Sequence, residues 1–189
     1  MNRRRKDFWK KCDSDFEERV EMIYEMFGKD LIVYFSRFTT LQFIEKHPEL
    51  TEKWNWTYLS MNPSITPEFV EKHIEKEWNW YGLSSNPSIT PAFIEKHPEW
   101  KWSWRSLSMN PSITPEFIEK HPEKKWSWYY LSKNPSITPE FIEKHPEWME
   151  RWDWDYLSRN LSITPEFVGI HLKKDWNWNE LSMNPSITL

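Results

Sequence analysis

Apolar and polar positions return in a fixed order along most of the chain. A phrase close to Trp-x-Trp-x-x-Leu-Ser-x-Asn-Pro-Ser-Ile-Thr occurs six times, and its Asn stands at 62, 86, 110, 134, 160 and 184, which gives steps of 24 residues and one step of 26. A fixed period of this size is typical of solenoids, in which each unit buries its apolar face only against its neighbours. The pattern therefore predicts a stacked array rather than one compact core.

Each unit begins with residues that predict a short helix. Thr114 can cap the free N–H groups, and Pro115 fits the first helical position, where its missing N–H is not needed. Phe117 and Ile118 are expected to face inward, and Pro122 ends the helix because the residue before a proline avoids helical angles. The same start recurs at Thr66, Thr90, Thr138 and Thr164.

The Trp pair belongs to a second, shorter segment that a short α-helix or a 3₁₀ turn would fit. Trp128 and Leu131 are three residues apart and share a face, whereas Trp126 points away from it. We therefore expect the second Trp of each pair in the core. The first Trp of each pair either fills the seam between units or binds a partner, and this column is Trp54, Trp78, Trp102, Trp126, Trp152 and Trp176.

Three parts follow from these patterns. Residues 1–12 form a basic arm that acts as a targeting signal, a nucleic-acid arm or a solubilising tail, and its cations are Arg3, Arg4, Arg5, Lys6, Lys10 and Lys11. Residues 13–40 predict an N-terminal helical cap, and residues 41–189 predict a repeat solenoid of about six units of 24–26 residues. The last unit has no polar cap after it, so it forms either a thin lid or an apolar end face through which copies could associate end to end.

The phrase Leu-Ser-x-Asn-Pro-Ser-Ile-Thr-Pro-Glu-Phe-Ile resembles the leucine-rich repeat variant family over roughly residues 38–189. The resemblance implies an all-α, right-handed solenoid of short helix pairs, each an α-helix followed by a short α- or 3₁₀-helix. Aromatic residues such as Tyr129 and Tyr130 replace the family's Val-Arg, and the family's iron–sulfur association does not carry over because Cys12 is the only cysteine. The Trp-rich form is also similar to uncharacterised repeat proteins of giant DNA viruses, which implies a viral origin.

Composition adds the cellular setting. The chain contains fifteen Trp and only three Gly, so indole rings must supply the buried apolar area that Leu and Val supply in other arrays. One cysteine excludes a disulfide framework and fits a reducing compartment. No apolar stretch approaches the ~18 residues of a membrane helix, and no signal peptide is visible. We expect no membrane association and an intracellular location, which for a viral protein means host cytoplasm, nucleus or virion.

All six histidines occupy one repeat position, namely His47, His73, His97, His121, His145 and His171. Packed helices lie about 8–10 Å apart, whereas zinc needs each nitrogen at about 2.1 Å, so the column suits helix ends better than a metal. The chain has no phosphate loop or nucleophile elbow, and every candidate acid or base recurs in each unit. We therefore expect no enzyme activity, no metal site and no cofactor.

These observations favour a non-enzymatic scaffold, structural or protein-binding, that presents an extended repeat surface to a protein partner. The main alternative is a repeat protein that binds single-stranded nucleic acid through the basic arm and exposed Trp rings. The repeats are net acidic, which counts against that alternative. End-to-end homo-oligomerisation is the third interpretation.

Overall fold

The computed structural model describes residues 36, 37 and 39–187, and this part of the chain is an all-helical solenoid of short helix pairs. The first helices of the units are α4 (Leu41–Lys46), α6 (Pro67–Lys72), α8 (Pro91–Lys96), α10 (Pro115–Lys120), α12 (Pro139–Lys144) and α14 (Pro165–Ile170). The second helices are α5 (Trp56–Leu59), α7 (Trp80–Ser85), α9 (Trp104–Leu107), α11 (Trp128–Ser132), α13 (Trp154–Leu157) and α15 (Trp178–Met183). The predicted all-α array is confirmed.

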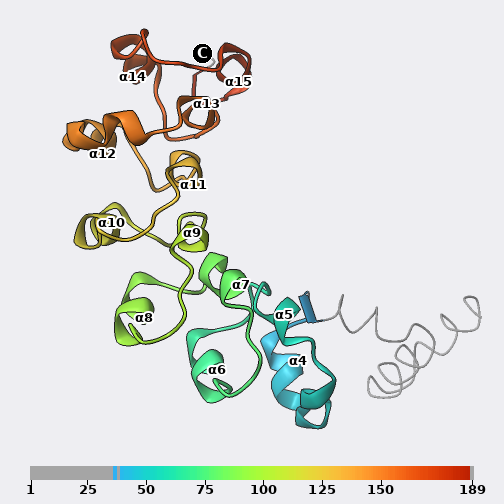
Figure 1. Cartoon of the computed structure of the whole chain (residues 1–189). Coiled ribbons are helices and arrows are strands. Elements are labelled where there is room, and N and C mark those ends of the chain that lie inside the picture. The colour runs from blue at the N-terminus through green and yellow to red at the C-terminus, as the bar shows by residue number, and fades with distance from the viewer. Residues whose placement is uncertain (1–35, 38, 188–189) are drawn as a thin grey trace, which may run out of the picture.

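The helix pairs stack into an arc with two rows (Figure 1). The first helices, α4 to α14, lie along the outside of the curve and form the outer row. The second helices, α5 to α15, lie along the inside of the curve and form the inner row. Inner-row neighbours pack directly on one another, as α7 does on α9 and α11 on α13. The arc therefore has a concave face made by the second helices.

Both rows begin with side-chain caps. In every outer-row helix the threonine before it accepts a hydrogen bond from the backbone N–H three residues later, as Thr114 does from Phe117. In the inner row the residue between the two Trp plays the same role at five of the six helices, as Asn79 does for Gly82. The predicted threonine caps are confirmed, and a second set of caps stands inside each Trp pair.

Two units are lengthened at the bend between their helices. The extra residues form the 3₁₀-helices η1 (Pro48–Lys53) and η2 (Pro146–Arg151), which each begin at the proline after the histidine. In the other units a short turn lies between the first helix and the extended first Trp.

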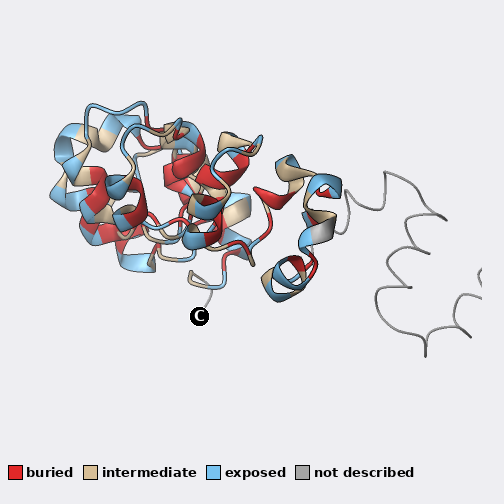
Figure 2. Cartoon of the chain, turned by 90° about the horizontal axis from the view of Figure 1, so that it is seen from below, coloured by how far each residue is buried: buried red, intermediate tan, exposed pale blue. Residues whose placement is uncertain are grey.

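The core runs through the whole array between the two rows (Figure 2). Each full unit contributes a Leu and an Ile that are almost completely buried, as Leu107 and Ile113 are, and an outer-row phenylalanine such as Phe117. The basic arm (residues 1–12) and most of the predicted helical cap (residues 13–40) lie outside the described residues. Within the described residues, no helix is long and apolar enough to cross a membrane.

Candidate functional site

The structure buries the first Trp column, for which the sequence left two roles open, the seam between units and partner binding. The first column is buried, with 4–8% of each residue exposed at Trp54, Trp78, Trp102, Trp126, Trp152 and Trp176. This burial favours the seam between units over a partner-binding role for these indoles. The reason is the cap inside each pair: the helix starts at the second Trp, so the first Trp stays on extended backbone and enters the core.

Buried indole rings need a partner for their N–H groups, and the histidine backbone supplies it. The indole nitrogens of Trp78, Trp102, Trp126 and Trp176 each donate to the carbonyl of the histidine five residues earlier, at 2.8–2.9 Å. Trp54 and Trp152 have no such bond, and they follow η1 and η2, which separate them from the histidine by two more residues. The first Trp column is thus a structural element of each bend.

The second column lies at the joints between units and is mostly half-buried. Trp104 stacks on Phe117 of the next unit at 6.0 Å and meets Trp126 edge-on at 5.1 Å. A cation or another ring covers more of these indoles: Lys124 lies 5.1 Å from the Trp104 ring, and Trp100 lies 5.6 Å from the Trp80 ring. These contacts are intramolecular, so the Trp ladder is not an open row of stacking surfaces.

A ladder of buried amides, which the sequence pattern does not predict, joins the units. Asn110 is fully buried and its amide nitrogen donates to the carbonyls of Ser84, Asn86 and Ile89 at 2.8–3.2 Å. Its side-chain oxygen accepts from the backbone N–H of Ser112 at 2.9 Å. The repeated Asn was visible as a period in the sequence, but its partners belong to the preceding unit and are close only after stacking.

The serine four residues after the second Trp of each pair forms a parallel ladder. Ser84 and Ser108 accept hydrogen bonds from the backbone N–H of Ser103 and Ser127, each at 2.9 Å. Ser36 does the same for Asn55 at 3.0 Å, so the described chain already follows the repeat register at its first residue. Both ladders satisfy backbone and side-chain polar groups that stacking removes from water.

The outer row carries a charged ladder in which one unit holds the next. Glu119 of α10 bonds Lys144 at 2.7 Å and the ring of His145 at 2.8 Å, and both residues belong to the next unit. The hydrogen bond from Lys144, with that from His145, holds the pKa of Glu119 below its ordinary value. Glu71 has the same arrangement with Lys96 and His97, and its pKa is lowered in the same way.

The histidines are therefore helix ends and ladder members. Each is the C-cap residue of its outer-row helix, as His121 is for α10, and its ring lies 4.3–5.1 Å from the phenylalanine four residues earlier. In the described part of the chain no three His, Cys, Asp or Glu side chains are grouped so that they could hold a metal ion. His97 and His145 instead bond glutamates of the preceding unit, and His121 and His171 lie 3.8 and 3.7 Å from theirs.

The inner row differs from the outer row because its outward positions change from unit to unit. The position after the second Trp holds Thr57, Tyr81, Arg105, Tyr129, Asp155 and Asn179. The position before the ladder Asn holds Met61, Ser85, Met109, Lys133, Arg159 and Met183. Outer-row positions repeat far more closely. Glu71, Glu95, Glu119 and Glu143 are each followed by Lys and His. The unit after each of them again has a lysine at the same position, except after Glu143, where that position is Ile170.

Tyrosines and cations gather in the middle of the inner row. Lys133 lies 5.3–5.6 Å from the ring centroids of Tyr129, Tyr130 and Tyr156. Arg105 lies 5.0 Å from the Tyr130 ring. Tyr129 and Tyr156 share a hydrogen bond between their hydroxyls. We call Tyr81, Arg105, Tyr129, Tyr130, Lys133 and Tyr156 the tyrosine–cation surface.

Hydrogen bonds and charge also shape the titration of this surface. The pKa of Tyr130 is lowered by hydrogen bonds with Arg105 and Tyr81, whereas the bond to Tyr156 raises the pKa of Tyr129. Among the described residues, no carboxylate forms an ion pair with Arg105 or Lys133, although Arg159 nearby pairs with Asp155 and Glu180 at 3.6 and 3.2 Å. The centre of the concave face is therefore aromatic and positively charged.

No family model, curated protein or solved structure matches the chain. The tyrosine–cation surface is thus singled out by its own features: curvature, exposure, and variation between units.

Proposed function

We propose that the protein is a non-enzymatic scaffold that binds a protein segment along the inner row. The observation that carries this proposal is the contrast between near-invariant side chains at the joints and changing, exposed side chains on the concave face. Solenoids use curved faces of this kind as extended binding surfaces, and repeats that differ there can recognise a partner that is not itself repetitive. Tyr81 and Tyr129 are among the exposed large residues of this face.

The chemistry of the surface also favours a protein ligand. Tyrosine and arginine are enriched among the residues that dominate binding energy at interfaces, because both bring large contact area and directional polar groups. Arg105 and Lys133 are not neutralised by an ion pair within the described residues, so a partner segment with carboxylate side chains is complementary to them. Lys133 and Arg105 already lie over the tyrosine rings, which leaves less open ring surface for nucleobases.

The non-enzymatic part of the proposal rests on how the acids and bases of the described units recur. Acids and bases such as Glu119 and His145 recur at equivalent places in successive units and bind each other across joints. An active site brings different groups together at one place instead. We therefore assign these groups to the construction of the array.

A crosslinking experiment tests the binding face. The photoreactive residue benzoylphenylalanine is placed at Tyr129 on the inner row or at Lys120 on the outer row, in extracts of the cell that makes the protein. We expect the same defined partner to be crosslinked from position 129 and not from position 120. Capture should fall when Lys133→Glu is added, because the variant repels a carboxylate-bearing segment, and should persist with Lys101→Glu, which changes an exposed lysine in the bend before α9.

The result that overturns the proposal is equal crosslinking from both rows, or capture that is indifferent to Lys133→Glu. The nucleic-acid interpretation has its own signature in a second assay. Binding of single-stranded RNA or DNA that weakens steeply with salt and disappears on removal of residues 1–11 would replace a protein ligand by a polyanion.

A further inference from the structure

An alternating series of cations and tyrosine rings crosses three successive units of the inner row. The Arg105 guanidinium lies 5.0 Å from the Tyr130 ring centroid, and the Lys133 ammonium lies 5.3 Å from the same centroid. Lys133 also lies 5.5 Å from the Tyr156 ring, which Arg159 approaches to 5.1 Å. The series passes from the unit of α9 to the units of α11 and α13 (Figure 1), in the order Arg105, Tyr130, Lys133, Tyr156 and Arg159.

The Tyr130 ring that Arg105 and Lys133 share limits how far apart their charges can be. Two groups at 5.0 and 5.3 Å from one centroid cannot be farther apart than those two distances together. Both side chains are exposed, and among the described residues no carboxylate forms an ion pair with either. Like charges held this close repel each other, so an anionic ligand that bridges them gains two attractions and relieves that repulsion.

Tyrosine rings hold both cations in place before a ligand binds. Lys133 lies 5.3–5.6 Å from the rings of Tyr129, Tyr130 and Tyr156. Arg105 lies over the Tyr130 ring and donates a hydrogen bond to its hydroxyl. A long side chain that is already held loses less conformational entropy when a ligand fixes it. The Lys133 ammonium has three N–H donors, so those that do not face a ring can bond a carboxylate.

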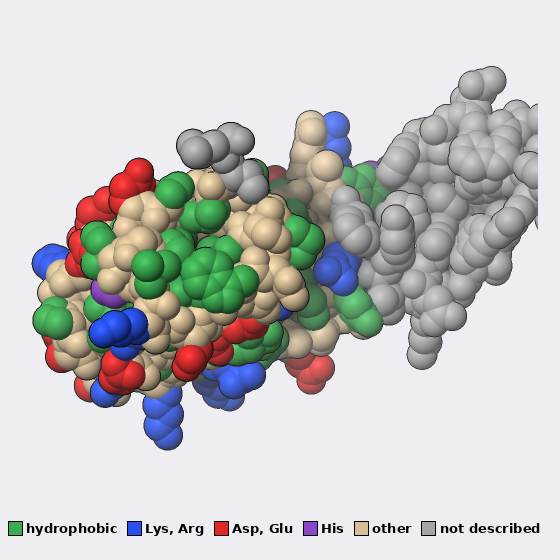
Figure 3. Space-filling model, turned by 90° about the horizontal axis from the view of Figure 1, so that it is seen from above, with side chains coloured by type: hydrophobic (Ala, Val, Ile, Leu, Met, Phe, Trp, Pro, Cys, Tyr) green, Lys and Arg blue, Asp and Glu red, His purple; other side chains and the backbone are tan. Residues whose placement is uncertain are grey.

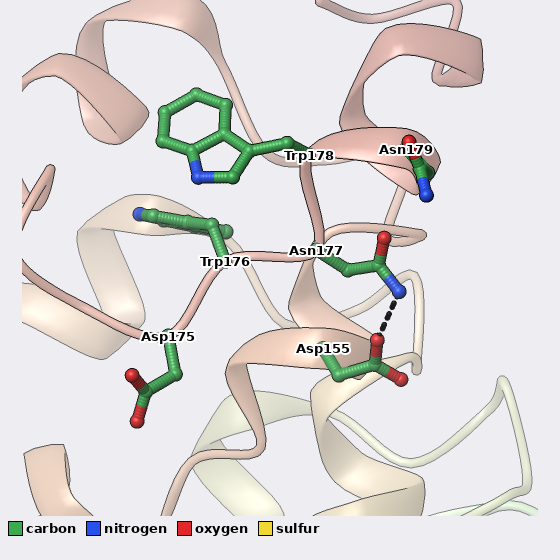
Figure 4. A pocket seen from close by; sticks show the side chains of 6 residues that line it. All are labelled: Asp155, Asp175, Trp176, Asn177, Trp178 and Asn179. Atoms are coloured by element: carbon green, nitrogen blue, oxygen red, sulfur yellow. Dashed lines mark hydrogen bonds between the residues drawn. The ribbon is translucent and has the colours of Figure 1, made fainter.

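The third cation of the series, Arg159, differs because carboxylates already neutralise it. Figure 3 looks onto the end of the array that holds α13, α14 and α15, and acidic and basic side chains lie next to one another there. Arg159 lies 3.2 Å from Glu180 and 3.6 Å from one oxygen of Asp155. The other oxygen of Asp155 accepts a hydrogen bond from the Asn177 amide (Figure 4). The positive part of the series therefore ends at Lys133.

On the other side of Arg105 the equivalent inner-row positions carry no charge. They hold Tyr81 and Ser85 in the preceding unit, and Thr57 and Met61 in the unit before that. The attraction for anions is thus confined to two neighbouring units.

An extended peptide segment presents side chains at a spacing that suits these two cations. In extended backbone, residues two apart point to the same side and lie about 6.6 Å apart along the chain, whereas adjacent residues point to opposite sides. This spacing is within the limit that the shared Tyr130 ring sets for Arg105 and Lys133. Carboxylates form strong, charge-assisted hydrogen bonds with guanidinium and ammonium groups.

We propose that the partner segment carries two acidic residues at alternate positions, and that their carboxylates bind Arg105 and Lys133. This inference rests on the proposed function, because it specifies the ligand of the same surface. The segment lies in extended conformation along the inner row, with one carboxylate at each cation. The part of the segment that passes Asp155 and Glu180 is neutral or basic, because a third acidic residue there would be repelled.

Selection from a phage-displayed library of random dodecapeptides tests the spacing, with the full chain as the immobilised target. We expect the enriched peptides to share two acidic residues separated by one residue. The double variant Arg105→Glu, Lys133→Glu should instead enrich two basic residues at the same spacing, because both charges are reversed. The control variant Lys46→Glu, Lys72→Glu makes the same change in net charge at exposed outer-row positions, and should enrich the same acidic peptides as the unchanged protein.

Fluorescence anisotropy of one enriched peptide then measures the contribution of the spacing. A peptide of the same composition with its two acidic residues adjacent should bind about tenfold more weakly, since only one carboxylate can then face the cations. Lys133→Ala in the protein should weaken binding of the original peptide by a similar factor. Circular dichroism of each variant checks that the helices are intact.

Several outcomes would overturn this inference. These are enriched peptides without alternate acidic residues, the same acidic peptides enriched by the Arg105→Glu, Lys133→Glu variant, or no enrichment at all. Tighter binding of an oligothymidylate than of the selected peptide, abolished by that double variant, would assign the two cations to a phosphate backbone instead. In each case, crosslinking of a defined protein from position 129 alone would leave the proposed binding face intact, whereas equal crosslinking from both rows would remove the proposed function itself.

Discussion

The outer and inner rows are built from the same repeat but use their exposed positions in opposite ways. On the outer row the exposed charges hold neighbouring units together, as Glu119 does with Lys144 and His145. On the inner row the exposed positions vary, and Arg105 and Lys133 contact tyrosine rings rather than carboxylates. The sequence thus repeats closely where a side chain bonds a side chain of the neighbouring unit. It varies where the side chain faces the inside of the curve.

The largest expected difference between the rows comes from deleting one ring in each. Phe117→Ala removes a buried outer-row ring that packs on Trp104 and Trp126, and we expect it to lower the free energy of unfolding by about 3–5 kcal/mol. Tyr129→Ala removes an exposed inner-row ring and should have a much smaller effect. Urea unfolding of both variants measures the contrast, and comparable losses would show that the inner row is also a structural element.

The amide ladder between the rows gives the next effect. Asn110→Ala removes the amide that bonds three carbonyls and one N–H of the joint, so we expect a loss of about 2–4 kcal/mol. Lys133→Ala, on an exposed inner-row position, is the control and should leave the unfolding midpoint near that of the unchanged protein. A small effect at Asn110 would mean that water replaces the amide at this joint.

The helix caps offer a matched pair with a smaller expected difference. Thr114 caps α10 through its hydroxyl, whereas Ser127 before α11 makes no side-chain cap bond. Thr114→Ala should therefore cost about 1 kcal/mol, and Ser127→Ala should be close to neutral. Thermal unfolding followed by circular dichroism compares the two, and a cost at Ser127 equal to that at Thr114 would contradict the assignment of the caps.

The smallest expected effect is the pH dependence of the outer-row ladder. The bonds from Lys144 and His145 lower the pKa of Glu119 in the folded state below its ordinary value of 4.5. This carboxylate therefore stabilises the fold fully above its ordinary pKa, and the contribution is lost as pH falls through the lowered pKa. Unfolding should show that Glu119→Gln destabilises the protein at neutral pH and that the difference from the unchanged protein shrinks in acid.

Glu68→Gln provides the control for that titration. Glu68 is an exposed outer-row residue of α6, so its replacement should produce a smaller difference at neutral pH. A difference for Glu119→Gln that stays constant down to acid pH would show that the ladder carboxylate does not act through its charge.

Local sequence determined most of the helices. Thr114 with Pro115 specifies a helix start through bonds and angles within one turn, and Pro122 limits its end, so these positions are readable without any neighbour. The period of the Asn positions likewise determined that the chain is an array, because only stacking can bury the apolar face of so short a unit. The two lengthened bends were also visible as extra residues at Pro48–Lys53 and Pro146–Arg151.

Only the tertiary structure decided which Trp column is buried and what the polar repeat positions bind. Spacing places Trp128 on one face with Leu131 but leaves Trp126 with two roles, the seam between units or partner binding, because spacing does not show at which residue the helix starts. Once the helix starts at Trp128, Trp126 enters the core and Trp128 moves to the joint. The partners of Asn110 and Glu119 belong to other units, and contacts across about 24 residues depend on how units stack rather than on local preferences.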